Sequence, residues 1–306
     1  MKNSFLNFEF ALVKFPIFFP IIYGVMLYSF PQFETYILFF TILLLAETHF
    51  GATWPFFLHK SKKKFIKENK FHLIAFPVSI IILSLLGYFF FKKFFLLIFF
   101  AANMYHVTRQ SFGVCKLYTK NETEKNYQEI FIYSINILFF LIGYFRFYLP
   151  FITAEDLIIL NIIVLSVIVT IVLIYYIKFK SNNFFTFITG LLIFYPICFV
   201  DNPVHAIVMG VTMHYTQYLY LTHKVYKGRK KNNPALSSGS YYLIIILFYS
   251  IAMTSLSIFA KSTNEILSIL IIIPIIGQML HFYLDSQLWK FSNVHNRNNV
   301  LSFLRD

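Results

Sequence analysis

The sequence predicts an all-α, polytopic membrane protein, and two observations carry that prediction. Hydrophobic residues make up 58% of the 306 positions and charged residues only 13%, with a mean hydropathy of +0.67. Soluble domains carry about 25% charged residues. The composition therefore excludes a soluble enzyme, a disordered chain and a nucleic-acid-binding module. We find no repeat and no soluble segment, so we expect one integral membrane domain over residues 1–306.

The second observation is a series of apolar runs of membrane-spanning length. A bilayer core about 30 Å thick requires about 20 apolar residues per helix. The runs predict a bundle of about ten spans at residues 8–30, 35–58, 72–91, 94–115, 129–149, 157–178, 184–200, 203–223, 241–260 and 265–289. The tightest breaks are at Pro31, Lys92–Lys93, Pro150 and the Asp201-Asn202-Pro203 corner. That corner alone joins the seventh and eighth spans, so we expect these two spans to form a hairpin.

The distribution of basic residues predicts how the bundle is oriented. The formal net charge is +13, and most Lys and Arg residues follow the even-numbered spans. The connections after those spans carry Lys60, Lys62, Lys63, Lys64, Lys67, Lys70, Lys116, Lys120, Lys125, Lys178, Lys180, Lys224, Lys227, Arg229, Lys230, Lys231, Lys290, Arg297 and Arg305. The positive-inside rule then places both termini in the cytoplasm. We expect a multi-pass protein of the bacterial inner membrane, with contact to lipid headgroups as a second use of this charge.

Four histidines lie inside apolar runs, and they share one depth. His49, His106, His214 and His281 each occupy a different even-numbered span. They precede the next basic boundary by eleven, ten, ten and nine residues respectively. At 1.5 Å per residue, all four lie ~14–16 Å from the cytoplasmic boundary. Four separate hydrogen-bonded histidines are the simpler interpretation. Equal depth favours a shared site, since buried ionisable groups in membranes are by default functional.

Other polar residues accompany these histidines on the same helix faces. Gln110, Gln217 and Asp285 follow a histidine by three or four residues, a spacing that places side chains on one face. We expect them to orient the imidazoles or to act in catalysis, or alternatively to satisfy one another. Glu47 is the other buried acid. It is expected to pair with Arg109 or Lys14, with a second metal or proton transfer as alternatives.

Histidine ligands restrict the metal and the chemistry. His72, at the cytoplasmic edge of the third span, is the only spare ligand that we consider. Imidazole suits iron, copper or zinc rather than magnesium or calcium. We favour iron (Fe²⁺), because four neutral ligands leave two octahedral positions for dioxygen and a substrate. Zinc or copper is the less favoured cofactor. The HExxH motif and the histidine clusters of membrane desaturases are absent.

The histidine layer, with Thr48-His49-Phe50-Gly51-Ala52 early and His106 on a later helix, resembles the Brp/Blh family of membrane carotenoid (β-carotene) dioxygenases. The resemblance covers the general layout and the residues around His49. It implies a histidine-held iron and oxidative cleavage of a carotenoid. Where that family has an acid after its early His-Gly segment, this chain has Thr53 and Trp54.

Two classes of function remain open from the sequence. The first is a non-haem iron oxygenase, a dioxygenase or monooxygenase, that acts on an isoprenoid, carotenoid or other lipid. Its lipid-soluble substrate would enter sideways from the bilayer. A di-iron lipid hydroxylase or desaturase-like enzyme is an alternative within this class. The second class is a proton-coupled transporter, since intramembrane His, Glu and Asp are typical of proton relays. The sequence predicts no nucleic-acid partner and identifies no protein partner.

Overall fold

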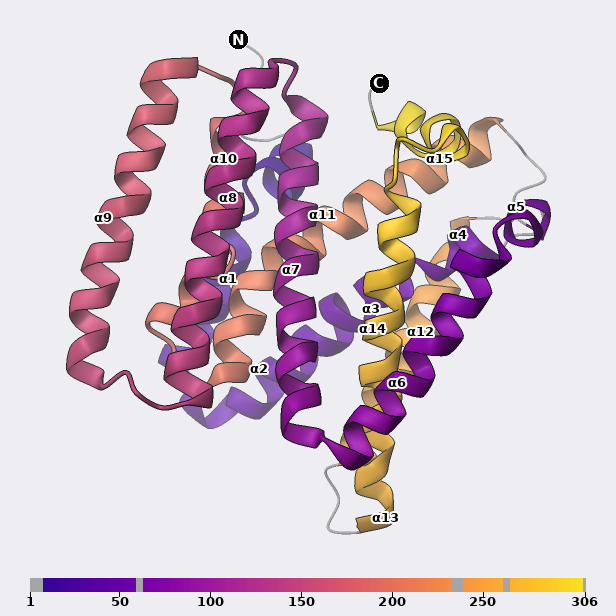
Figure 1. Cartoon of the computed structure of the whole chain (residues 1–306), viewed down its shortest axis with the longest axis horizontal. Coiled ribbons are helices and arrows are strands. Elements are labelled where there is room, and N and C mark those ends of the chain that lie inside the picture. The colour runs from indigo at the N-terminus through magenta and orange to yellow at the C-terminus, as the bar shows by residue number, and fades with distance from the viewer. Residues whose placement is uncertain (1–7, 59–62, 233–238, 261–264, 305–306) are drawn as a thin grey trace. The chain divides into compact units, whose positions relative to one another are not determined.

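The computed structural model describes residues 8–58, 63–232, 239–260 and 265–304 (Figure 1). Over these ranges the chain is helical and contains no strand, which confirms the all-α prediction. The predicted basic residues Lys60, Lys62 and Arg305 lie outside the described ranges.

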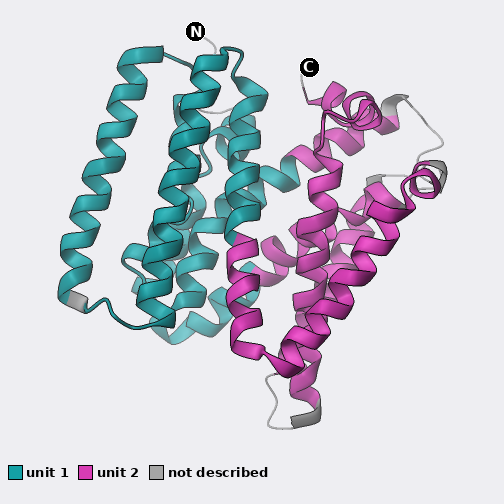
Figure 2. Ribbon diagram, in the orientation of Figure 1, with its two compact units in different colours: residues 1–41, 104–220 teal, residues 42–103, 221–306 magenta. Residues whose placement is uncertain are grey.

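The chain divides into two compact units, which Figure 2 shows in two colours. Unit 1 comprises residues 1–41 and 104–220, and unit 2 comprises residues 42–103 and 221–306. Two long helices, α7 (Lys92–Tyr118) and α11 (Pro203–Asn232), each have one part in either unit. The expectation of a single membrane domain stays a prediction, and the units are described in turn.

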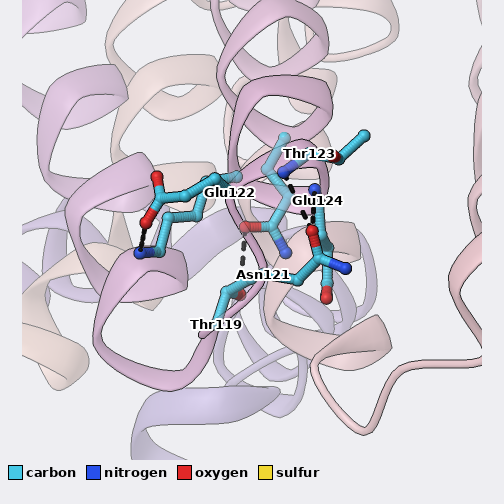
Figure 3. A network of polar contacts seen from close by, with 7 residues as sticks. Thr119, Asn121, Glu122, Thr123 and Glu124 are labelled. Carbon is cyan, nitrogen blue, oxygen red and sulfur yellow. Dashed lines mark hydrogen bonds and ion pairs between the residues drawn. The ribbon is translucent and has the colours of Figure 1, made fainter.

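Unit 1 contains the following elements besides its parts of α7 and α11. They are η2 (Phe10–Lys14), α1 (Phe18–Ser29), η3 (Pro31–Phe33), α2 (Glu34–Thr41), α8 (Glu122–Gly143), η7 (Tyr144–Tyr148), α9 (Ala154–Phe179), α10 (Phe184–Leu192) and η8 (Tyr195–Cys198). Side-chain caps set two of the helix starts. Asn121 accepts hydrogen bonds from the first backbone amides of α8, as Figure 3 shows. Thr153 and Asp156 form a capping box at α9.

A buried polar network joins α8 and α9 of unit 1, and Figure 3 shows Thr119 and Glu124, which belong to it. Thr119 donates to the side chain of Gln128 at 3.1 Å, and Gln128 donates to the hydroxyl of Tyr175 at 3.0 Å. Tyr175 in turn donates to Glu124 at 2.5 Å. Because every member has a partner, this network fixes α9 against α8 without leaving a buried polar group unsatisfied.

Unit 2 contains the following elements besides its parts of α7 and α11. They are η4 (Ile42–Ala46), α3 (Glu47–Gly51), α4 (Trp54–Leu58), α5 (Lys63–Glu68), η6 (Phe71–Ala75), α6 (Phe76–Phe90), α12 (Gly239–Phe259), α13 (Glu265–Ser268), η9 (Ile269–Ile271), α14 (Ile272–Leu288), α15 (Val294–Asn299) and η10 (Leu301–Phe303). Helix α3 packs closely on α12, because a Cβ at Gly51 would lie only 3.2 Å from the Cα of Ile246. Glycine therefore permits the approach of these two backbones.

Six helical segments within the described ranges are long and apolar enough to cross a membrane, which indicates a membrane protein. These segments are Pro31–Phe57, Phe71–Phe90, Glu122–Tyr148, Glu155–Phe179, Tyr241–Phe259 and Ile269–Leu288. Helices α7 and α11 are also long, with 27 and 30 residues, but they are less apolar. They carry His106 and His214, and the polar residues around these histidines lower their hydropathy. The count of ten spans and the cytoplasmic termini stay predictions.

Two of the predicted spans differ from the structure. The run at 8–30 is interrupted at Phe15-Pro16-Ile17, between η2 and α1. The run at 184–200 forms only the nine-residue α10, a turn and η8. Nine residues extend about 14 Å, so α10 alone does not cross a bilayer. Proline explains both interruptions. Pro16 disfavours the helical conformation of Phe15, the residue before it. Pro196 has no backbone N–H to donate to the carbonyl of Leu192, the last residue of α10.

Candidate metal site

Unit 2 brings together two of the four predicted histidines. His49 lies in α3 and His281 in α14, and both side chains are 0% exposed. Their ring centroids are 4.5 Å apart, and one ring nitrogen of each lies within 4.8 Å of the other. Two imidazoles bound to one ion at about 2.1 Å have nitrogens at most about 4.2 Å apart. This pair could therefore hold a metal ion with a small adjustment.

Thr53, which was not among the predicted site residues, contacts His281 of this pair. Thr53 lies just after α3, is 1% exposed, and its Oγ1 is 2.8 Å from Nδ1 of His281. If Nδ1 of His281 is the protonated ring nitrogen and donates a hydrogen bond to Thr53, then Nε2 is unprotonated and its lone pair is available to a metal. Such a hydrogen bond fixes the tautomer and the ring orientation of a ligand histidine. One signal was present in the sequence, because Thr53 follows His49 by four residues, a spacing that predicts a shared face in a helix.

Two acids of unit 2, Glu47 and Asp285, are buried and hydrogen-bonded. Glu47 accepts a hydrogen bond of 3.4 Å from Gln278, whereas its Oε2 has no hydrogen-bond partner among the described residues. Asp285 accepts from the indole of Trp289 at 2.6 Å. Glu47 is thus two residues from His49 in the sequence, and its hydrogen bond with Gln278 connects it to α14, the helix that carries His281. Its expected pairing with Arg109 stays a prediction, and the Arg109 side chain is exposed.

Unit 1 brings together the other two histidines. His106 on α7 and His214 on α11 are buried, and their ring centroids are 5.5 Å apart at nearly a right angle. Gln217 is also buried, and it donates to the backbone carbonyl of Val13 at 2.7 Å. Gln217 therefore connects α11 to η2, the segment before the interruption at Pro16. It also lies one turn from His214. Gln110, one turn after His106, is half-buried.

The remaining histidines with described side chains lie outside these two pairs. His72 is exposed, 3.5 Å from the hydroxyl of Tyr283, so the structure places this spare ligand at a surface of unit 2. His205 is buried. Its two ring nitrogens contact Tyr23 at 2.6 Å and Glu34 at 2.9 Å.

The donor set is suited to a transition metal but does not select one. Neutral imidazole binds zinc, copper, iron and nickel alike. The pairing of buried histidines within each unit therefore supports metal binding and leaves the identity of the metal open.

Comparison with known proteins gives no match, either to a family model, to a curated protein or to a solved structure. The resemblance to the carotenoid dioxygenases thus rests on the residues around His49 and stays a prediction.

Proposed function

We propose that this chain is a membrane-embedded, histidine-ligated iron oxygenase that acts on a lipid-soluble substrate. The observation that carries the proposal is the presence of a buried histidine pair in each compact unit, His49 with His281 and His106 with His214. In each unit the two histidines come from helices far apart in the sequence, so local sequence alone does not account for their contact.

The ground for treating the four histidines as one ligand set is their equal depth in the sequence. Four neutral nitrogens would leave two positions of an octahedral iron for dioxygen and substrate, and bound iron would supply the oxygen activation. The protein's own contribution is to hold the imidazoles in a dry environment. Thr53 would accept a hydrogen bond from the Nδ1–H group of His281, and Gln217 would hold the segment around Val13 beside α11.

The proposed substrate is an isoprenoid, a carotenoid or another lipid, and the proposed location is the bacterial inner membrane. Among the described residues, six helical segments, distributed over both units, are long and apolar enough to cross a membrane. A substrate that dissolves in the bilayer reaches such segments without crossing water. The resemblance around Thr48–Ala52 favours a carotenoid.

Metal analysis tests the proposal. Full-length protein purified from cells supplied with iron is expected to carry about one iron per chain, and each single His→Ala variant at the four positions is expected to lose it. Two irons per chain would favour the alternative of a di-iron enzyme, with Glu47 and Asp285 as further ligands. Protein without a stoichiometric transition metal would contradict the proposal.

A proton-coupled transporter is the second candidate, and one observation favours it. Unit 1 contains two interrupted segments, η2 with α1 and α10 with η8, and transporters often place binding sites at broken helices. At the first interruption, however, Gln217 and Thr189 donate to the carbonyls of Val13 and Lys14. Those carbonyls therefore already have protein partners. Proton-coupled flux in proteoliposomes that survives His106→Ala would favour the transporter.

A further inference from the structure

Unit 1 contains an apolar cavity of about 310 Å³. Its wall combines Gly24 and Val25 of α1 with Met209 and Met213 of α11. Pro196 of η8 and Phe199, the residue after η8, form the rest of the wall. Ligand pockets in proteins begin at about 300 Å³, so this cavity is large enough to bind a ligand.

The cavity exists because of the local sequence. Gly24 has no side chain, and a Cβ there would lie 3.3 Å from the terminal methyl of Met209. Helix α10 ends at Leu192, and the chain then turns into η8, so this wall is built from a turn and Pro196 instead of a continuous helix. Any side chain larger than a methyl group at position 24 would project into the space.

The wall offers almost no hydrogen bonds to a ligand. Among the described residues that line it, Tyr195 has the one side-chain hydroxyl, and this group donates to Asn161 at 2.5 Å. The methionines are flexible and polarisable, so they adapt to occupants of different shape. The chemistry of the wall thus selects a hydrocarbon and rejects a polar molecule.

The residues at the edge of the cavity indicate where an occupant enters. Ile21 is 54% exposed, Val25 is 57% exposed, and both lie on the face of α1 that lines the cavity. In a membrane protein, such exposed apolar side chains face lipid tails. The entrance is therefore apolar, and a lipid-soluble molecule reaches it from the bilayer.

We infer that this cavity holds the hydrocarbon chain of the substrate, an inference that rests on the proposed function. A volume of 310 Å³ accommodates about ten groups of the size of water, which corresponds to part of one hydrocarbon chain and is too small for the two tails of a phospholipid. Met213 directly precedes His214 on α11. A chain that lies along Met209 and Met213 therefore reaches the level of the unit 1 histidine pair, about 7.5 Å along the helix from Met209.

The test uses purified full-length protein in detergent and cis-parinaric acid, a fluorescent fatty acid with one polyene chain. Gly24→Leu fills the cavity and is expected to weaken binding about tenfold, a change of about 1.4 kcal/mol. Gly113→Leu is the matched control, because a Cβ at Gly113 meets no atom within 4 Å. Equal binding by wild type and Gly24→Leu, or equal loss in both variants, would overturn the inference.

A second variant and a competition experiment complete the test. Val25→Phe narrows the entrance at a half-exposed position that tolerates a larger side chain, so it is expected to weaken binding even if Gly24→Leu fails to fold. Displacement of the probe by excess two-chain phosphatidylcholine would instead identify the occupant as bulk lipid and overturn the inference.

The iron content separates this inference from the proposed function. Gly24→Leu is expected to retain the iron of the wild type, because position 24 contacts Met209 and none of the four histidines. Iron retained with no probe binding in the wild type contradicts the cavity inference alone. Probe binding without iron contradicts the proposed function alone.

Discussion

The hydrogen bond between Thr53 and His281 provides the sharpest prediction. Thr53→Val removes the hydroxyl 2.8 Å from Nδ1 while it keeps a β-branched side chain of similar size. If Nδ1 donates to Thr53 in the metal-bound state, the variant leaves a buried N–H without an acceptor. Such a group costs about 1–3 kcal/mol. The dissociation constant of the metal should therefore rise about 5- to 150-fold.

The assay is competition for iron between the purified protein and a chelator of known affinity. Thr53→Ser keeps the hydroxyl and is expected to bind iron within about twofold of the wild type. Thr48→Val is the matched control for the loss of a buried hydroxyl, because the Thr48 hydroxyl donates to the backbone carbonyls of Leu44 and Leu45 in the preceding turn, η4, and not to a histidine. Unchanged affinity in Thr53→Val, or an equal loss in Thr48→Val, would refute the reasoning. The proton would then reside on Nε2, and His281 would not bind a metal through that nitrogen.

Two other substitutions test separate parts of the structure. Tyr175→Phe removes the hydroxyl between Glu124 and Gln128, so it is expected to lower the free energy of unfolding by about 1–3 kcal/mol. Thermal denaturation in detergent measures this effect, and an equal loss in the exposed control Tyr176→Phe would contradict it. Glu47→Gln is expected to leave the ratio of one iron per chain unchanged, because the proposed ligands are all histidines. Elemental analysis showing that this variant loses iron would instead make Glu47 a ligand.

Hydropathy predicted the helical class and most helix positions, since the length of an apolar run directly reflects the thickness of the bilayer. It did not predict where a run is interrupted, and the segments around Pro16 and Pro196 show why. Prolines are tolerated in membrane helices when neighbours satisfy the freed backbone groups, so their presence alone does not decide between a kink and a break. At the segment before Pro16, the side chains that donate to the backbone carbonyls are those of Gln217 and Thr189, which come from distant parts of the chain.

The sequence singled out four histidines but not which of their rings contact one another. Equal spacing from the basic boundaries predicts that the four share one depth. Which rings meet depends on the rotation of each helix about its axis, and packing determines that rotation. Thr53 was missed because a threonine does not stand out from an apolar run as a histidine does. His72 was considered for its position in sequence, but its helical face is exposed.

The central claim is that buried imidazoles hold the metal, and X-ray absorption at the iron edge of the purified protein tests it most directly. The account predicts nitrogen ligands at about 2.1 Å with scattering from imidazole rings, and loss of this signal when His49 and His281 are both replaced by alanine. An iron spectrum that is unchanged in the double variant, or one without imidazole scattering, would contradict the claim.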